Sequence, residues 1–223
     1  MQIVSDKTEF KLQGASAVAI GKFDGIHAGH YRLIDEILRQ KKNGLQSVIF
    51  TFFPSATLYF GGEEAKELTT REEKREIFER MGIDVLVEFP LNPETAATIP
   101  VDFVKKILIG MMNMKFLAAG EDVSFGKGGK GNRALLEEMA EENDFSVRII
   151  EKIFDHGKEI SSTYVREEIL KGNMELASEL LSRNYSIEGI VENGMHLGRK
   201  MGFPTVNLYP PEEKLMPPYG VYY

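Results

Sequence analysis

The fold of this protein is set by the stretch Ala17-Val18-Ala19-Ile20-Gly21-Lys22-Phe23-Asp24-Gly25-Ile26-His27-Ala28-Gly29-His30. Its four apolar residues at 17–20 predict a buried strand. Beyond the glycine-containing loop, Leu33, Ile34, Ile37 and Leu38 recur at helical spacing, which predicts a helix that ends at Asn43-Gly44. Strand, loop and helix in this order form a phosphate-binding unit, because a helix start offers unpaired N–H groups and the positive end of its dipole.

The alternation of short apolar runs and helix-period segments continues through most of the chain. It predicts strands at 47–53, 84–89, 116–119 and 147–153, and helices at 70–81, 104–112, 133–142 and 174–183. Thr70 and Glu73 have the spacing of a capping box at the start of one helix. We expect an α/β, Rossmann-like domain with roughly five parallel strands and helices on both faces.

A second, smaller unit is expected after the last of these helices. Residues 185–191 alternate like a strand, and the remainder is rich in glycine and proline. A boundary near Asn184 therefore divides the chain into domains at 1–183 and 184–223.

Composition excludes several classes of protein. The 223 residues carry a net charge of −7, which argues against a general nucleic-acid binder, since such a protein needs a basic face. The chain has no cysteine, which excludes disulfides, thiolate catalysis and Cys-based zinc sites. The N-terminus lacks the apolar core of a signal peptide, and nowhere do about 18 uncharged apolar residues run together. We expect a cytoplasmic protein with no membrane partner; the oligomeric state is not predicted.

The loop at 21–30 carries residues suited to phosphate chemistry. Gly21, Gly25 and Gly29 let the backbone approach phosphate oxygens. His27 and His30, three residues apart at a helix start, can project to one side and donate hydrogen bonds to charge that develops in a transition state. Two other interpretations are open: metal ligation by the histidines beside Asp24, and a purely structural helix start.

This loop resembles the G-x-F-D-G-x-H-x-G-H signature of the adenylyltransferase half of bacterial FAD synthetases. A looser form, centred on H-x-G-H, marks cytidylyltransferases and pantetheine-phosphate adenylyltransferases. The resemblance implies catalytic roles for His27 and His30. It implies ATP or phosphate binding by the other signature residues of the loop, which are Gly21, Phe23, Asp24, Gly25 and Gly29.

A second phosphate site is predicted at Glu159-Ile160-Ser161-Ser162-Thr163-Tyr164-Val165-Arg166. The segment reads as a strand end followed by a hydroxyl-rich helix start, and the helix runs to Lys171-Gly172. An ordinary N-cap is the alternative interpretation. The segment is similar to the I-S-S-T-x-x-R signature of the same family. That similarity implies phosphate binding by Ser161, Ser162 and Thr163, and a catalytic role for Arg166, whose guanidinium can fork two phosphate oxygens.

The glycine-rich loop at 120–132 carries a third match. Asp122, Phe125 and Gly126 fit the family segment G-x-D/N-F-x-F-G, which implies contacts with flavin and nucleotide. Two positions differ from the family pattern: Val123 replaces an aromatic residue, and Ser55-Ala56 stand where His-Pro is usual.

Near the C-terminus, residues 198–208 resemble the G-R-x-x-G-F-P-T-x-N-L signature of riboflavin kinase. The resemblance implies that Thr205 and Asn207 contact Mg-ATP, and that residues 184–223 begin a small β-barrel kinase domain. The glutamate that acts as base in that family lies beyond residue 223. Kinase activity on riboflavin is therefore expected only for a longer chain.

The resemblance as a whole implies that AMP passes from ATP to FMN with release of pyrophosphate. Mg²⁺ is expected to arrive bound to the ATP phosphates, with no dedicated protein site in the first domain. One alternative is a nucleotidyltransferase with another phosphate acceptor. Another is a protein that binds flavin or nucleotide without turnover.

Overall fold

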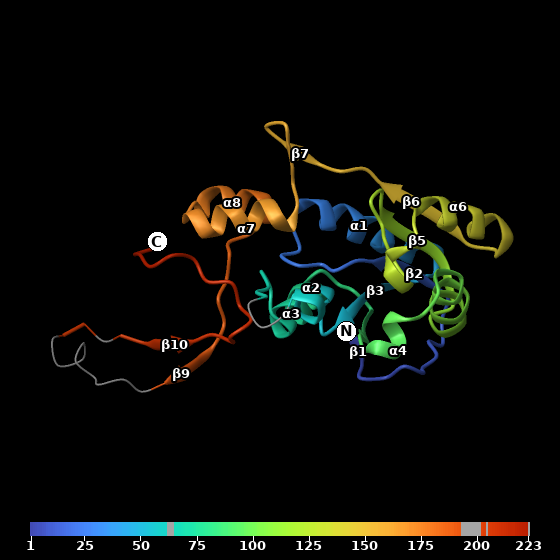
Figure 1. The fold of residues 1–223 in the computed structure, drawn as a ribbon, viewed down its shortest axis with the longest axis horizontal. Coiled ribbons are helices and arrows are strands. Elements are labelled where there is room, and N and C mark those ends of the chain that lie inside the picture. The colour runs from blue at the N-terminus through green and yellow to red at the C-terminus, as the bar shows by residue number, and fades with distance from the viewer. Residues whose placement is uncertain (62–64, 193–201, 204, 223) are drawn as a thin grey trace.

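The computed structural model describes residues 1–61, 65–192, 202–203 and 205–222 (Figure 1). At its centre lies a six-stranded, all-parallel sheet with the order β1-β4-β3-β2-β5-β6. The strands are β1 (Gln2–Ser5), β2 (Ser16–Ile20), β3 (Gln46–Phe53), β4 (Val85–Pro90), β5 (Met114–Gly120) and β6 (Ser146–Ile150). The predicted parallel sheet is confirmed, with one strand more than the five expected.

The additional strand is β1, at the edge of the sheet. Gln2 pairs with Val85 and Ser5 with Glu88. Within this strand only Val4 is buried. The segment has no apolar run long enough to predict a strand from the sequence. The segment is a strand because it pairs with β4, which lies more than eighty residues further along the chain.

Helices cover both faces of the sheet because its strands alternate their side chains. On one face, Ala17 and Ala19 pack in a cluster with residues of α1 (Ala28–Arg39) and α3 (Arg71–Arg80). On the other, Val18 and Ile20 share a cluster with residues of the π-helix at Phe103–Met111 and of α6 (Arg133–Glu142). Both faces are therefore dry, as a parallel sheet requires.

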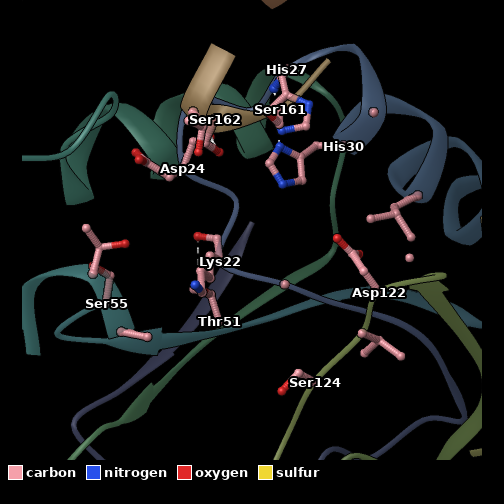
Figure 2. A pocket seen from close by; sticks show the side chains of 18 of the residues that line it. Lys22, Asp24, His27, His30, Thr51, Ser55, Asp122, Ser124, Ser161 and Ser162 are labelled. Atoms are coloured by element: carbon pink, nitrogen blue, oxygen red, sulfur yellow. Dashed lines mark hydrogen bonds between the residues drawn. The ribbon is translucent and has the colours of Figure 1, made fainter. Parts of the chain in front are cut away.

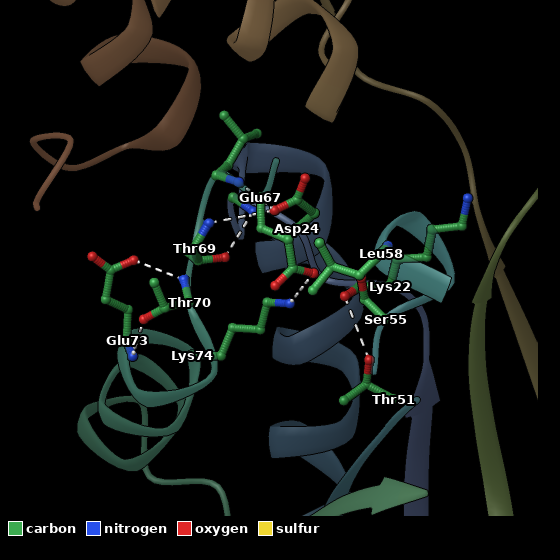
Figure 3. Close-up of polar contacts among 12 residues, drawn as sticks. Lys22, Asp24, Thr51, Ser55, Leu58, Glu67, Thr69, Thr70, Glu73 and Lys74 are labelled. Carbon is green, nitrogen blue, oxygen red and sulfur yellow. Dashed lines mark hydrogen bonds and ion pairs between the residues drawn. The ribbon is translucent and has the colours of Figure 1, made fainter. Parts of the chain in front are cut away.

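The predicted capping box is present at α3. The Thr70 hydroxyl accepts a hydrogen bond from the N–H of Glu73 at 3.3 Å, and the Glu73 carboxylate accepts one from the N–H of Thr70 at 2.9 Å (Figure 3). The remaining short helices are α2 (Ala56–Gly61), α4 (Pro93–Ala96) and α5 (Pro100–Asp102), with 3₁₀ turns at Gln40–Asn43 and Lys127–Gly129.

The last part of the chain holds two helices and two small antiparallel pairs. Helices α7 (Ser162–Lys171) and α8 (Met174–Leu181) lie side by side and form a third apolar cluster with Leu68 and Leu215 (Figure 1). The pairs are β7 (Phe154–Asp155) with β8 (Lys158–Glu159), and β9 (Ile190–Glu192) with β10 (Asn207–Tyr209). Of the strand predicted at 185–191, only residues 190 and 191 lie in a strand, β9. No helix in the described ranges is long and apolar enough to cross a bilayer.

Candidate active site

A cavity of about 1020 Å³ opens at the carboxyl ends of the central strands (Figure 2). It is lined by residues at the ends of β2, β3, β5 and β6 and by the first turn of α7. Strand β2 lies between β3 and β5. From β2 the chain continues to β3 and β4 on one side of the sheet, and later strands β5 and β6 are added on the other side. Ligands of open α/β sheets bind at such a switch point, and the histidine loop, residues 21–30, follows β2 directly into it.

Most of the predicted site residues meet at this cavity, although they come from three distant segments. Those that line it are Gly21, Asp24, His27, Gly29, His30, Asp122, Phe125, Ser161, Ser162, Thr163 and Arg166. Phe23, Gly25 and Gly126 lie outside the lining, as do Thr205 and Asn207.

His27 and His30 are stacked on one another. Their ring centroids are 3.8 Å apart with an interplanar angle of 33°. The His30 Nδ1 accepts a hydrogen bond from the backbone N–H of His27 at 3.3 Å, which assigns the ring proton to Nε2. Figure 2 shows the other nitrogen of His30 turned into the cavity. His30 can therefore donate a hydrogen bond to a ligand there.

Both histidines are held neutral near pH 7. Burial lowers the pKa of His27 to about 4, with a smaller contribution from the charge of the Arg183 guanidinium. Burial also brings the pKa of His30 well below its usual value, with a smaller contribution from His27. A stacked pair of imidazoles cannot readily carry two charges, so the site offers neutral N–H donors.

Arg183 is a functional candidate that sequence reasoning missed. Its guanidinium donates to the carbonyl of Gly25 at 2.6 Å and to that of Ile26 at 3.0 Å, and so fixes the turn that leads into His27. The side chain follows α8, 157 residues beyond the carbonyl of Ile26. No motif near position 183 indicates this contact.

Asp24 and Arg166 join the two predicted phosphate segments. The Arg166 guanidinium donates to Asp24 Oδ2 at 2.8 Å, while Asp24 Oδ1 accepts the N–H of Leu68 at 2.7 Å. Burial raises the pKa of Asp24, and the charge of nearby Lys74 lowers it in part. Arg166 also donates to the carbonyl of Lys66 at 2.8 Å. These contacts use two of its five N–H groups, so others are available for a phosphate.

The start of α7 combines an N-cap with a bridge to the histidine loop. The Ser161 hydroxyl accepts the N–H of Tyr164 at 3.3 Å, as the cap interpretation expects. The Ser162 hydroxyl donates to the carbonyl of Asp24 at 2.7 Å, whereas Thr163 is exposed. The two hydroxyls thus have structural partners, and an anion at this helix start would meet free backbone N–H groups as well.

The glycines of the histidine loop serve different purposes. At Gly29 an added Cβ would lie 3.1 Å from the His27 ring, so glycine makes room for the stacked imidazoles. Gly25 has φ of +81°, and its Cβ would lie 2.8 Å from a methyl of buried Leu68. Gly25 is thus required by backbone conformation and packing, and its approach to phosphate stays a prediction.

Phe23 also has a packing role, and its predicted contact with phosphate stays a prediction. Its ring is fully buried and meets Phe78 edge-on at 5.5 Å between centroids. The same ring lies 5.1 Å from His30. Phe23 therefore packs against the His30 ring and helps to fix its position.

The glycine-rich loop is closed by two hydrogen bonds between the backbones of Phe125 and Gly131, at 3.1 and 2.8 Å. Phe125 packs against Phe103 with centroids 5.4 Å apart. Gly126 has φ of +69° and lies against Pro100, which explains its place behind the lining. Asp122 is exposed at the cavity rim, 3.5 Å from the Lys152 ammonium.

Several lining residues were given no role at the site from the sequence. They include the cations Lys22, Lys66 and Lys152, the hydroxyls of Thr51 and Ser55, and the aromatic rings of Phe50, Phe52 and Phe103. Lys22 lies within the histidine loop at a position that the signature leaves open, and the others lie in segments for which the sequence predicts no contact with a ligand. Ser55, one of the positions that departs from the family pattern, is buried and accepts the N–H of Leu58 at 3.2 Å.

The kinase-like residues lie apart from the cavity. Thr205 and Asn207 are exposed, and Asn207 pairs with Glu192 across the β9–β10 ladder. Much of the predicted signature, at 198–201 and 204, lies outside the described residues. The Mg-ATP role of Thr205 and Asn207 stays a prediction.

Comparison with known proteins now adds to this geometry. The family model described as FAD synthetase matches residues 9–164, which is most of the chain. The chain belongs to the FAD synthetase family. A second family model, described as riboflavin kinase, matches residues 181–223.

Curated relatives of this family member carry both activities in their names. A bifunctional riboflavin kinase/FMN adenylyltransferase of Buchnera aphidicola from Schizaphis graminum is 36% identical over 89% of this chain and 64% of its own length. The enzymes of the same name from Bacillus subtilis and Escherichia coli K12 are 35% and 32% identical, each over 94% of this chain and 67% of their own. The chain thus spans about two thirds of the length of these relatives.

One solved structure has the same fold over nearly the whole chain. A crystal structure described as a macrolide-efflux protein from Streptococcus pneumoniae superposes with a TM-score of 0.81 at 28% identity. It covers 96% of this chain and 70% of its own.

Proposed function

We propose that this chain transfers AMP from ATP to FMN and releases pyrophosphate. An oxygen of the FMN phosphate attacks the α-phosphorus of ATP, and the bond from that phosphorus to the bridging oxygen of the β-phosphate breaks. The observation that carries the proposal is the meeting of His27, His30 and Arg166 at one cavity, although they come from segments more than 130 residues apart. Relatives named for this activity support it.

The protein's contribution to this reaction is positioning and stabilisation of charge. His30 Nε2–H donates to an oxygen of the α-phosphate, with His27 stacked above it. Arg166 and the start of α7 hold the leaving phosphates. Because neutral histidines donate without changing protonation, they stabilise developing charge and need not transfer a proton.

The acceptor would lie against the aromatic part of the cavity. Phe52, Phe103 and Phe125 line it, and a planar flavin ring stacks readily on such side chains. The cavity volume of about 1020 Å³ lies at the upper end of the range for a pocket that holds one ligand. The cavity therefore has room for both substrates. Asp122 and Lys152 at the rim are placed to contact the polar groups of either substrate.

Mg²⁺ belongs to the proposal as a partner of the nucleotide. Among the residues that the structure describes, no three acidic, histidine or cysteine side chains gather in a way that could hold a metal ion. In our proposal the ion is therefore bound mainly by ATP phosphates, where it neutralises the charge of the leaving group. This also disfavours metal ligation by His27 and His30, which have no third partner of this kind in the described parts of the chain.

The test is product analysis with the 223-residue chain. It is incubated with ATP, Mg²⁺ and either FMN or riboflavin, and the flavins are separated by chromatography. FAD formed from FMN supports the proposal. Binding of ATP and FMN without FAD formation would contradict it and favour a binding protein, and turnover with another phosphate acceptor would move the chain to the second alternative.

Location and partners stay predictions. A chain without cysteine that uses ATP and FMN is expected to work in the cytoplasm, with small molecules as its partners and no nucleic acid. Formation of FMN from riboflavin is expected only when sequence beyond residue 223 completes the kinase half.

A further inference from the structure

Lys214 is a buried cation that lies outside the cavity and has no part in the reaction described above. Its side chain is 0% exposed. The Nζ donates to the Glu73 carboxylate at 2.6 Å and to the carbonyl of Leu68 at 2.8 Å, and it stands 4.4 Å from the centroid of the Tyr185 ring. Lys214 belongs to the part matched by riboflavin kinase, whereas both of its hydrogen-bond partners belong to the part matched by FAD synthetase.

The backbone around Lys214 is docked on the first domain in the same place. The N–H of Glu67 donates to the carbonyl of Glu213 at 2.7 Å, and the N–H of Leu215 donates to the carbonyl of Glu67 at 2.8 Å. Leu215 is buried against Leu68 in the third apolar cluster. Residues 213–215 therefore hold residues 67–68 through backbone hydrogen bonds, the bond from the Lys214 ammonium to the carbonyl of Leu68, and apolar contact.

The segment they hold, residues 66–69, also supports the phosphate site from its other side. Leu68 donates its N–H to Asp24 Oδ1 at 2.7 Å, while its carbonyl accepts from Lys214. Lys66 offers its carbonyl to Arg166, and Arg166 pairs with Asp24. A single residue, Leu68, thus separates Lys214 from the carboxylate that orients Arg166.

The cost of burying Lys214 points to a role beyond stability. Burial lowers the pKa of this lysine, with hydrogen bonding to Glu73 opposing the change. Buried ion pairs are often no more stable than apolar residues of the same volume, because desolvation offsets their attraction. What the ammonium supplies, and an apolar side chain would not, is a directed bond to the carbonyl of Leu68.

We propose that Lys214 is a positioning residue for the nucleotide site, acting through Leu68 on Asp24 and Arg166. The proposal rests on the proposed AMP transfer and adds that residues 213–215, in the part matched by riboflavin kinase, help to order the nucleotide site. Because Arg166 is expected to hold ATP phosphates before and during the reaction, its misplacement should weaken ATP binding more than it slows the chemical step.

The test compares Lys214→Met with Arg75→Met. Arg75 also pairs with a buried carboxylate, Glu88, at 2.8 Å, but it does not line the cavity, so its loss controls for general destabilisation. We expect Lys214→Met to raise the KM for ATP about tenfold with kcat within about threefold, and Lys214→Arg to restore most of the affinity. Arg75→Met should lower the melting temperature and leave the KM for ATP unchanged.

Lys214→Met leaves Glu73 as an unpaired buried carboxylate and can prevent folding. The double variant Lys214→Met/Glu73→Leu removes both charges, and it should fold and still show the raised KM. A KM equal to that of the wild type in either folded variant overturns the proposal. Calorimetric measurement of ATP binding separates the two hypotheses: a wild type that binds ATP but makes no FAD fails the proposed function, while weaker ATP binding by Lys214→Met than by Arg75→Met still supports positioning.

Discussion

The histidine loop and the C-terminal piece, residues 190–222, differ sharply in how they are held. In the loop, Phe23, Asp24 and His27 are all buried, and the loop bonds to side chains from α7 and from the end of α8. In the C-terminal piece, Ile190 and Val191 are 72% and 64% exposed and β9 pairs only with β10 among the described strands. Residues 213–215 are the exception, because they pack on residues 67–68, in the part matched by FAD synthetase.

This difference shows how strongly the surroundings fix each segment. The loop has a conformation that its surroundings determine, because the backbone of Leu68, two side chains of α7 and Arg183 all form hydrogen bonds with it. Strands β9 and β10 have apolar side chains that are exposed among the described residues, so their surroundings fix them only weakly. Function should therefore depend strongly on substitutions in the loop and weakly on those in β9 and β10.

The largest effect is expected at His30. His30→Ala removes the proposed donor to the α-phosphate, and kcat for FAD formation should fall on the order of 10²–10³-fold, as for loss of one transition-state donor. The fold should survive, since the ring lies at the cavity surface. Steady-state kinetics and circular dichroism measure both. His156→Ala, at a histidine that is 93% exposed, is the matched control; turnover of His30→Ala equal to that control would contradict the assignment.

A smaller effect is expected at Gly25, and it concerns stability. Gly25→Ala places a side chain at φ of +81° and against buried Leu68, so the free energy of unfolding should fall by roughly 2–3 kcal/mol. Gly44→Ala has a similar φ of +77° with no described atom within 4 Å of its Cβ, and should cost only about 1 kcal/mol. Urea denaturation measures the two. Equal losses would show that packing does not determine the loop.

The pH dependence of stability tests the buried state of His27. Its pKa of about 4 in the folded chain lies below the unfolded value, so the unfolded chain binds more protons in between and stability falls as pH decreases. The contribution of His27 should be about 2 kcal/mol between about pH 7.5 and about pH 5.

Asp24, with its raised pKa, acts in the opposite direction at lower pH, so the wild type is compared with His27→Gln. In that variant the number of protons taken up on unfolding, given by the slope of unfolding free energy against pH, should fall by about one. In His156→Gln it should not change. Identical pH profiles for His27→Gln and the wild type would mean that His27 is solvated.

The smallest effect is expected in β9. Val191→Thr keeps a β-branched residue on an exposed strand, so unfolding free energy and FAD formation should each change by less than about 0.5 kcal/mol. Urea denaturation and the flavin assay measure the two quantities. A loss above about 1 kcal/mol would show that the hairpin is packed against a partner, such as a second copy of the chain.

Local patterns in the sequence determined much of the fold. The apolar run at 17–20, the stripe at Leu33, Ile34 and Ile37, and the capping box of Thr70 and Glu73 each act within one element, and each is present in the structure. Strand β1 was missed because it has no such pattern and depends on pairing with β4. The motifs also identified the segments that meet at the cavity, since their residue types carry the chemistry.

Only the tertiary structure decided what those residues contact. Asp24 and Arg166 are 142 residues apart, Glu73 and Lys214 are 141 apart, and nothing local to either member of a pair specifies the other. The structure also gave Phe23 and Gly25 packing roles that no local pattern shows, because these roles depend on contact with Phe78 and Leu68. The sequence by itself thus determined which chemistry is present, through residue type and spacing. The packing of distant segments decided which groups face the ligand and which hold the site in place.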